Sequence, residues 1–282
     1  MSDFATRADR FFALHDGYFV IPTVWDRLSA LAAWQAGFSA VATSSAALGF
    51  ANFYLASERM PFGQVRDRLA EIVADVPVAV SIDMENGYPE WTGDIADSIA
   101  AIIDAGVVAA NLEDSDGDHA KPLVDADDHA RAISRARATA ERSGQRFFIN
   151  ARSDIFLSQP AVPERDAVEE AIRRARLYVA AGADGIYLPG RNLSDAVLDE
   201  LVAAIPAPLT VLAPPRPFGH WREIGVRRVS LGTAVIRSSY AAIQGQLAAA
   251  RSGLDIAPLP DIEGALRLSR SGHDAPTAPL TQ

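Results

Sequence analysis

Two carboxylate residues stand two positions apart at the end of an apolar run of the chain. Asp83 and Glu85 close residues 77–85, which are rich in Val and Ile. Side chains at positions i and i+2 point to the same side of a β-strand, so we expect both carboxylates to face one way. Like charges this close repel each other, and each raises the pKa of the other. The pair therefore indicates a shared proton or a bound divalent cation.

The same spacing recurs in the next two apolar runs. The side chains that share one side are Asn111, Glu113 and Ser115 in the first run and Asn150, Arg152 and Asp154 in the second. Three carboxylates (Asp83, Glu85 and Glu113) beside a guanidinium suit Mg²⁺ or Mn²⁺ held by few direct protein ligands. The Arg152 guanidinium suits a carboxylate or phosphate group of a substrate.

Other polar residues have simpler explanations. A lone carboxylate at a strand end commonly caps the following helix, so we expect Asp114 and Asp154 to be caps or salt-bridge partners. His129 lies in a helical pattern and is predicted to be a surface residue. The chain has no cysteine, and its five histidines form neither an HExxH nor an HxH pair, which excludes a soft-metal site of the usual kinds.

Eight short apolar runs could position these residues as strands: residues 18–25, 40–44, 77–85, 107–114, 146–154, 185–189, 209–213 and 228–232. Amphipathic segments with helical spacing lie between them, at residues 27–36, 63–74, 95–105, 126–143, 164–181, 194–204 and 233–250. Strands joined by single helices run parallel, and eight such units close a barrel. The sequence thus predicts an α/β fold, a (β/α)₈ TIM-like barrel.

Glycines support these boundaries, because Gly37, Gly106, Gly182 and Gly225 each fall where a helix would end in a left-handed residue. An open, doubly wound sheet is the structural alternative, but no GxGxxG motif opens a helix after the first strand. In a parallel barrel the functional face is formed by the carboxyl ends of the strands, where the polar residues above are found.

Composition narrows the class of protein. The 282 residues carry a formal net charge of −10 and 49% hydrophobic residues. This acidity argues against nucleic acid as a partner, and no apolar stretch is long enough for a membrane span. Charged residues at the N-terminus do not fit a secretory signal, and the lack of cysteine fits a reducing compartment. We expect a cytoplasmic protein.

Two segments depart from the alternating pattern. Residues 50–62, after the second predicted strand, are long enough for a lid or an extra helix and carry several aromatic side chains. After residue 253 the chain becomes rich in Pro and Ser. We therefore predict one catalytic barrel at residues 1–253 and a C-terminal extension at residues 254–282 that is partly disordered or lies at a subunit contact.

In this order and at these strand ends, several strings of residues resemble the isocitrate lyase / phosphoenolpyruvate mutase superfamily over about residues 12–253. They are Trp25-Asp26, Ala42-Thr43-Ser44-Ser45, residues 83–88 (DMENGY), residues 111–115 (NLEDS), residues 148–154 (FINARSD) and residues 181–185 (AGADG). The resemblance implies a barrel whose C-terminal helix is exchanged between subunits of a homodimer or homotetramer. It also implies a small 2-oxo or 2-hydroxy acid as the substrate.

The resemblance further implies roles for individual residues. Asp83 would be the direct Mg²⁺ ligand, with Glu85 and Glu113 holding the ion through water. Arg152 would bind the substrate carboxylate, helped by the backbone N–H groups around Ser44 and Ser45. Asn150 would line the site, and Trp25, at the end of the first predicted strand, is retained as a substrate contact.

Some motifs of the superfamily are missing. The Lys-Lys/Arg-Cys-Gly-His loop of isocitrate and methylisocitrate lyases has no counterpart in residues 116–123 (DGDHAKPL), and neither does the Lys-Thr-Asn loop of the mutases. Pro189 stands at the end of the sixth predicted strand, where relatives place His or Glu. His119 and Lys121, in the predicted gating loop, are our candidates for the missing general acid or base.

The leading hypothesis is an Mg²⁺-dependent lyase that cleaves or decarboxylates a small 2-oxo or 2-hydroxy carboxylic acid through a pyruvate-like enolate. Carbon–phosphorus chemistry of the phosphoenolpyruvate mutase or phosphonopyruvate hydrolase type is the first alternative. A barrel that binds a 2-oxo acid without turnover is the second. A phosphosugar-binding barrel is disfavoured, because residues 213–217 (APPRP) supply no glycine-rich phosphate cradle.

Overall fold

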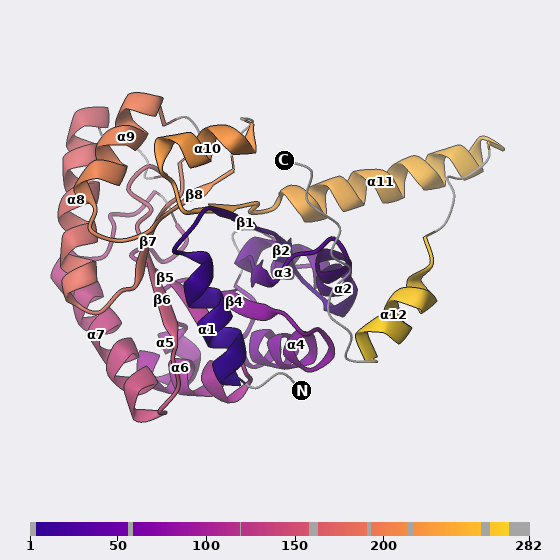
Figure 1. The fold of residues 1–282 in the computed structure, drawn as a ribbon, viewed down its shortest axis with the longest axis horizontal. Coiled ribbons are helices and arrows are strands. Elements are labelled where there is room, and N and C mark those ends of the chain that lie inside the picture. The colour runs from indigo at the N-terminus through magenta and orange to yellow at the C-terminus, as the bar shows by residue number, and fades with distance from the viewer. Residues whose placement is uncertain are drawn as a thin grey trace.

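The computed structural model describes residues 4–55, 59–118, 120–157, 163–190, 193–213, 217–254 and 260–270 (Figure 1). His119 and residues 271–282 lie outside these ranges. None of the helices in the described ranges has the length and apolar character needed to cross a membrane.

The described strands form one parallel sheet in the order β1-β9-β8-β7-β6-β5-β4-β3-β2. They are β1 (Phe19–Ile21), β2 (Thr23–Val24), β3 (Ala40–Thr43), β4 (Ala79–Asp83), β5 (Ala109–Glu113), β6 (Phe148–Arg152), β7 (Gly185–Leu188), β8 (Leu209–Leu212) and β9 (Arg228–Ser230). Each of the eight predicted runs contains a strand, and the first run contains two. The predicted TIM-like α/β fold is confirmed.

Pro22 divides the first run into β1 and β2. A proline has no backbone N–H to donate to a neighbouring strand, but the Pro22 carbonyl still accepts a hydrogen bond from the Ala42 N–H at 2.9 Å. On either side of Pro22, β1 pairs with β9 and β2 pairs with β3, both in parallel register. The first run therefore joins the two edges of the sheet and nearly closes the barrel.

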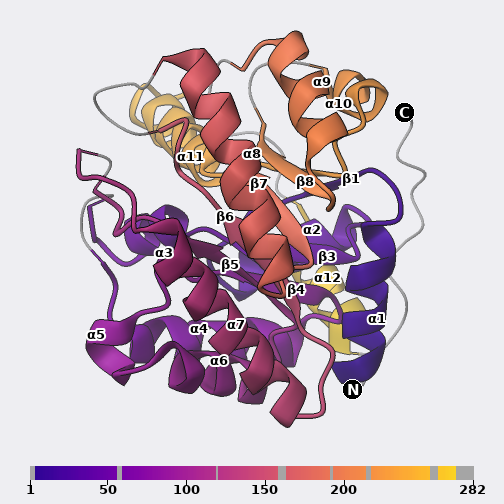
Figure 2. The same ribbon diagram turned by 90° about the vertical axis from the view of Figure 1, so that its left-hand side faces the viewer.

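Helices surround the strands: α1 (Phe4–Leu14), α2 (Arg27–Gln35), α3 (Ser45–Ala51), α4 (Phe62–Asp75), α5 (Pro89–Thr92), α6 (Ile95–Asp104), α7 (Ala126–Arg142), α8 (Glu164–Ala180), α9 (Asp195–Ala204), α10 (Phe218–Ile224), α11 (Ala234–Arg251) and α12 (Ile262–Arg270). Figure 2 shows α7 and α8 lying across the outside of the strands. The seven predicted helices are present; α1, α3, α5, α10 and α12 were not predicted as helices.

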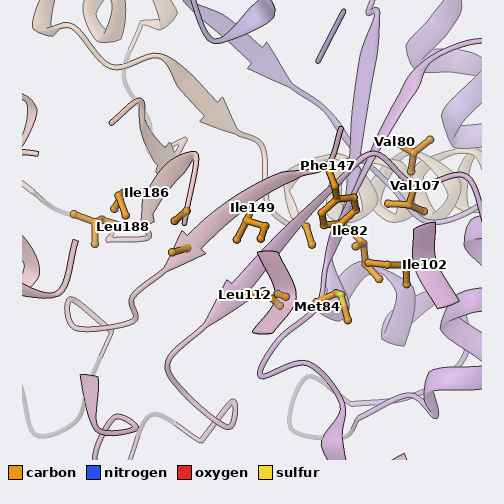
Figure 3. Close-up of a cluster of buried hydrophobic side chains, with 14 of the residues drawn as sticks. Val80, Ile82, Met84, Ile102, Val107, Leu112, Phe147, Ile149, Ile186 and Leu188 are labelled. Atoms are coloured by element: carbon orange, nitrogen blue, oxygen red, sulfur yellow. The ribbon is translucent and has the colours of Figure 1, made fainter. Parts of the chain in front are cut away.

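The main core lies between the strands and this ring of helices. Figure 3 shows Ile82, Leu112 and Ile149, from three successive strands, in a layer of apolar side chains that also includes Ile102 of α6. These four side chains are fully buried. Continuous apolar runs are expected of parallel strands, because both faces of such a sheet are covered.

Helix α1 closes the barrel at the amino ends of the strands. Ala8 and Phe11 of α1 are fully buried against the first residues of several strands, including Ala79 and Phe148. This helix was not predicted, because it precedes the first strand and so lies outside the alternation of strands and helices. It leaves the carboxyl ends of the strands as the open face.

The C-terminal helices lie apart from the ring. Helix α11 projects from the body of the molecule, and α12 returns toward α2 and α4 (Figure 1). Among the residues described, α11 has no buried side chain, whereas α12 contacts α2, and Ser269 Oγ donates to the Asp75 carbonyl at 2.7 Å. The C-terminal extension predicted from residue 254 therefore contains a helix that packs on the barrel of its own chain.

Candidate active site

A pocket of about 750 Å³ opens at the carboxyl ends of the strands. Its wall includes seven of the residues predicted from the sequence: Ser44, Ser45, Asp83, Glu85, Glu113, Lys121 and Arg152. They come from the ends of β3, β4, β5 and β6 and from the loops that follow. Residues that are up to 108 positions apart in the sequence, from Ser44 to Arg152, thus line one pocket, as the sequence predicted.

Asp83 lies at the centre of this group. Its Oδ2 atom accepts hydrogen bonds from the Ser45 N–H at 3.2 Å and from Ser45 Oγ at 3.1 Å. Its Oδ1 atom lies 3.3 Å from Nη1 of Arg152. Ser44 caps α3 through a hydrogen bond from the Ala47 N–H to its Oγ. The short turn from β3 into α3 thereby aims the Ser45 donors at the carboxylate.

Arg152 is held by three carboxylates. Its Nη1 atom lies 2.8 Å from Glu113, and its Nε and Nη2 atoms donate to the two oxygens of Asp154 at 2.7 and 3.0 Å. Burial alone lowers the pKa of the guanidinium, but attraction by Glu113, Asp154 and Asp83 outweighs burial and raises that pKa well above its ordinary value. Arg152 is therefore a permanent cation of the pocket.

Glu85 lines the pocket, but it does so from a loop and not as the strand residue that the sequence predicted. It lies two residues beyond the end of β4, with a backbone φ of +49°. Its carboxylate pairs with Arg59, which also pairs with Glu90 and donates to Asn86 at 2.9 Å. A left-handed backbone is uncommon for a residue with a side chain, so the contacts of this loop hold Glu85 in place.

The acids of the pocket suit a hard cation bound largely through water. Within the described ranges, no three His, Cys, Asp or Glu side chains lie close enough to hold one ion directly. Burial raises the pKa of Glu85 and, more strongly, that of Glu113, and repulsion by neighbouring acids adds to both shifts. Carboxylates in such surroundings favour a divalent cation, and Mg²⁺ commonly keeps several waters with one or two protein ligands. The residues fit Mg²⁺ or Mn²⁺ bound largely through water.

The other predicted residues lie in different places. Lys121 is exposed at the rim and bonds Asp116 at 2.7 Å, while His119 lies outside the described residues. Trp25 is not part of the pocket wall; it is half-buried and packs against the main core. Asn150 is fully buried beneath the pocket, where it donates to Asn111 Oδ1 at 2.9 Å. Of these two Asn side chains, Asn111 forms part of the wall.

Among the wall residues that were missed from the sequence are Arg59, Tyr187 and Arg237. Arg59 lies just before α4, and Arg237 lies on α11, where its guanidinium stands 5.4 Å from the ring of Phe50. Tyr187 is the last but one residue of β7 and pairs in register with Arg152 of β6. Tyr187 stands two positions before Pro189, so the i, i+2 rule for a strand places both on one side and could have identified Tyr187. Nothing in the spacing connects Arg59 or Arg237 with the acids.

The prediction that Asp114 and Asp154 act as salt-bridge partners is confirmed, because Asp114 pairs with Arg174 and Asp154 with Arg152. The prediction for His129 was wrong. This residue is 5% exposed, and its ring lies edge-on to Tyr178 with the centroids 4.8 Å apart. It lies on the inner face of α7, where the helical spacing of small apolar residues also places it.

The fold and the pocket define a parallel-barrel enzyme with its site at the carboxyl ends of the strands. Residues 11–251 match the family described as phosphoenolpyruvate phosphomutase, and the chain belongs to this family within the phosphoenolpyruvate mutase / isocitrate lyase superfamily. The predicted superfamily is thus confirmed.

Among its relatives is an uncharacterised protein of Mycobacterium tuberculosis, 34% identical over 221 residues that cover 78% of this chain and 80% of the relative. The 2-methylisocitrate lyase of Bacillus subtilis is 27% identical over 206 residues, which cover 67% of this chain and 60% of the relative. The crystal structure of 2,3-dimethylmalate lyase matches with a TM-score of 0.79 and 25% identity, over 96% of this chain and 97% of that one.

Proposed function

We propose that this enzyme is an Mg²⁺- or Mn²⁺-dependent lyase that acts on a small 2-oxo or 2-hydroxy dicarboxylic acid. It breaks a carbon–carbon bond, by cleavage or decarboxylation, through a pyruvate-like enolate. The observation that carries the proposal is the approach of Asp83 to Arg152, 3.3 Å apart in a pocket that Glu85 and Glu113 also line. A carboxylate for a cation and a guanidinium for a substrate carboxylate then lie side by side.

Each residue has a role in this reaction. Arg152 binds the substrate carboxylate next to the bond that breaks, and the N–H groups around Ser44 and Ser45 bind the same end. Asp83 would hold the cation directly, and Glu85 and Glu113 would hold it through water. When bound, the cation would supply positive charge beside the oxygen on which negative charge develops. Fixed donors aimed at that oxygen stabilise the transition state because they need no reorganisation during the reaction.

The rim of the pocket supports a second anionic group on the substrate. Arg59, Lys121 and Arg237 all line the pocket around the buried Arg152. Phe50 adds an apolar flank to the same wall. A dicarboxylate with a short apolar branch matches this distribution of charge and surface better than a monocarboxylate does.

Proton transfer to the enolate is assigned to the loop after β5. Lys121 lines the pocket, where its ammonium group donates to Asp116 Oδ2 at 2.7 Å. A protonated ammonium at the rim is a proton donor to a carbon that becomes nucleophilic when the bond breaks. His119, two residues earlier, is the second candidate.

Calorimetric binding of oxalate, a stable mimic of the pyruvate enolate, tests the site. We expect oxalate to bind wild-type protein only when Mg²⁺ is present, and we expect Asp83→Ala to lose that binding by about 100-fold or more, as for removal of a metal ligand. Binding that is independent of both Mg²⁺ and Asp83 would refute the proposed metal site. Asp75→Ala, on the surface at the end of α4, is the matched control and should bind as wild type does.

A substrate panel distinguishes the reaction types. Oxaloacetate, alkylmalates and alkylcitrates are expected to yield a 2-oxo acid in the presence of Mg²⁺. Release of phosphate from phosphonopyruvate, without carbon–carbon cleavage, would favour carbon–phosphorus chemistry instead. Oxalate binding with no turnover of any panel member would favour the barrel that only binds a 2-oxo acid.

A further inference from the structure

We propose that Asp154 is a positioning residue for Arg152, and that a buried cluster of Asp114, Arg174 and Tyr178 holds Asp154 in place from behind. This inference rests on the proposed function, because it takes Arg152 to be the group that binds the substrate carboxylate. It assigns a role to charged residues that lie outside the pocket wall.

Asp154 fixes the orientation of the Arg152 guanidinium. Asp154 accepts from Nε and Nη2 of Arg152 through both of its oxygens, a paired geometry that fixes the plane of the guanidinium. Ser115 Oγ donates to Asp154 Oδ2 at 2.9 Å and so restrains the carboxylate in turn. Nη1 is the atom directed at Asp83 and Glu113. Asp154 thereby selects which edge of Arg152 faces the pocket.

Asp154 differs from the other two carboxylates around Arg152 in the nitrogens that it contacts. Asp83 and Glu113 would hold the cation or its water, and each also contacts Nη1 of Arg152. Of the three carboxylates that hold Arg152 in the described structure, Asp154 is the one that contacts Nε and Nη2 and is not assigned to the cation. The exposed fraction of the Asp154 side chain is 0%, against 14% for Arg152. Asp154 is thus suited to hold the guanidinium while Nη1 exchanges a protein carboxylate for the substrate's.

Behind Asp154, a chain of contacts runs away from the pocket to helix α8. The Asp154 N–H donates to Asp114 Oδ1 at 3.0 Å. The other oxygen of Asp114 accepts from the Tyr178 hydroxyl at 2.8 Å and from Arg174 Nη1 at 3.0 Å. Asp114 and Tyr178 are fully buried, and Arg174 is 8% exposed. The cluster therefore ties helix α8 to the backbone just beyond the end of β6.

The cost of this cluster supports a role beyond stability. Burying an ion pair carries a desolvation penalty that its own attraction often fails to offset, and apolar residues of similar size commonly serve stability as well. Here one Asp114 oxygen bonds the main chain of Asp154, and both Asp154 oxygens bond Arg152. The contacts thus form a continuous path from α8 to the pocket, with Nη1 of Arg152 at its end.

Calorimetric binding of oxalate in saturating Mg²⁺ tests the inference, with the melting temperature measured for every variant. We expect Asp154→Asn to raise the Kd about 10-fold or more, and Tyr178→Phe to raise it about threefold, as for groups that orient a binding residue. Asp154→Glu, which keeps the charge, should recover part of the lost affinity. Asp184→Asn is the matched control, because Asp184 also pairs with an arginine, Arg137, and accepts a backbone N–H, from Ile149, but lies away from the pocket.

The control separates positioning from stability. A merely structural role predicts that Asp154→Asn and Tyr178→Phe lower the melting temperature as Asp184→Asn does, with the oxalate Kd unchanged; that result overturns the inference. Should Asp154→Asn fail to fold, Tyr178→Phe, which removes a single oxygen atom, decides alone. Arg152→Met distinguishes the two proposals: if this variant still binds oxalate, the proposed function fails, whereas loss in Arg152→Met without loss in the other variants overturns only the positioning role.

Discussion

Arg152 shows how much of this pocket depends on individual residues. One guanidinium contacts Asp83, Glu113 and Asp154, which come from three successive strand ends or the residues just after them. The i, i+2 argument placed Asp83 and Arg152 correctly, because each is the last residue of its strand. The same argument placed Glu85 in the pocket for the wrong reason, since Glu85 lies in a left-handed turn beyond the strand.

At the residue scale, we predict that His15 makes stability depend on pH. Burial lowers the pKa of this imidazole to about 3, and the nearby Arg228 adds to the shift. In the unfolded chain, His15 has a pKa near 6.5 and takes up a proton below that pH, whereas in the folded chain it stays neutral. Stability therefore falls as the pH falls below 6.5. Between pH 7 and pH 5, His15 alone should cost about 2 kcal/mol of unfolding free energy.

Urea unfolding of wild type and His15→Gln at pH 7 and pH 5 measures this effect. The variant should lose less stability than wild type over that interval, by about 2 kcal/mol. Phe12→Leu is the control, because Phe12 packs in the same cluster, 5.1 Å from Phe148 between ring centroids, without a titrating group. Equal losses in wild type and His15→Gln would contradict the prediction.

At the scale of elements, short turns decide where each strand begins. Gly37, Gly106, Gly182 and Gly225 all have positive φ, as predicted, and the next strand begins within a few residues of each. At Gly106 the φ is +86°, and a Cβ atom would lie 2.7 Å from Cγ1 of Val73 on α4. This turn therefore fixes both the backbone conformation and the approach of α4 to the loop before β5.

We predict that Gly106→Ala destabilises the protein by about 1–3 kcal/mol, because the left-handed backbone and the contact with Val73 both oppose a side chain. Gly63→Ala is the matched control: Gly63 lies in α4 without positive φ, and a Cβ there meets nothing within 4 Å. It should be neutral or stabilising, since alanine favours helices. Urea unfolding at neutral pH compares them, and equal free energies for both variants would show that the Gly106 turn is not under constraint.

At the scale of the whole molecule, α11 stands apart from the barrel (Figure 1). Tyr240, Ile243 and Leu247 lie on one face of this helix and are 57–66% exposed. The resemblance described above implies that the C-terminal helix is exchanged between subunits. We therefore propose that a second copy of the chain covers this face in a homodimer or homotetramer.

Light scattering after size-exclusion chromatography tests this assembly. Wild type should have the mass of a dimer or tetramer, and Ile243→Glu should shift it toward the monomer, because a charge buried at an apolar contact is unfavourable. Ala242→Glu adds the same charge on another face of the helix and should leave the mass unchanged. A monomeric wild type would refute the exchanged helix.

Local patterns in the sequence determined a large part of this protein. Strand and helix alternation, with glycines at the helix ends, was sufficient to predict the barrel, and its carboxyl face then placed Asp83, Glu113 and Arg152 in one pocket. These features depend on neighbours in the chain: the period of the side chains, the caps and the parallel crossovers. The family followed from the same strand ends.

Tertiary structure alone decided the rest. Arg59 and Arg237 enter the pocket from a loop and from α11, and α1 closes the opposite end of the barrel. The cluster around Asp114 is buried because α7 and α8 pack side by side, which the helical period of each helix does not reveal. Contacts between side chains of distant segments depend on how the individual helices and loops pack in space, which a local pattern does not specify.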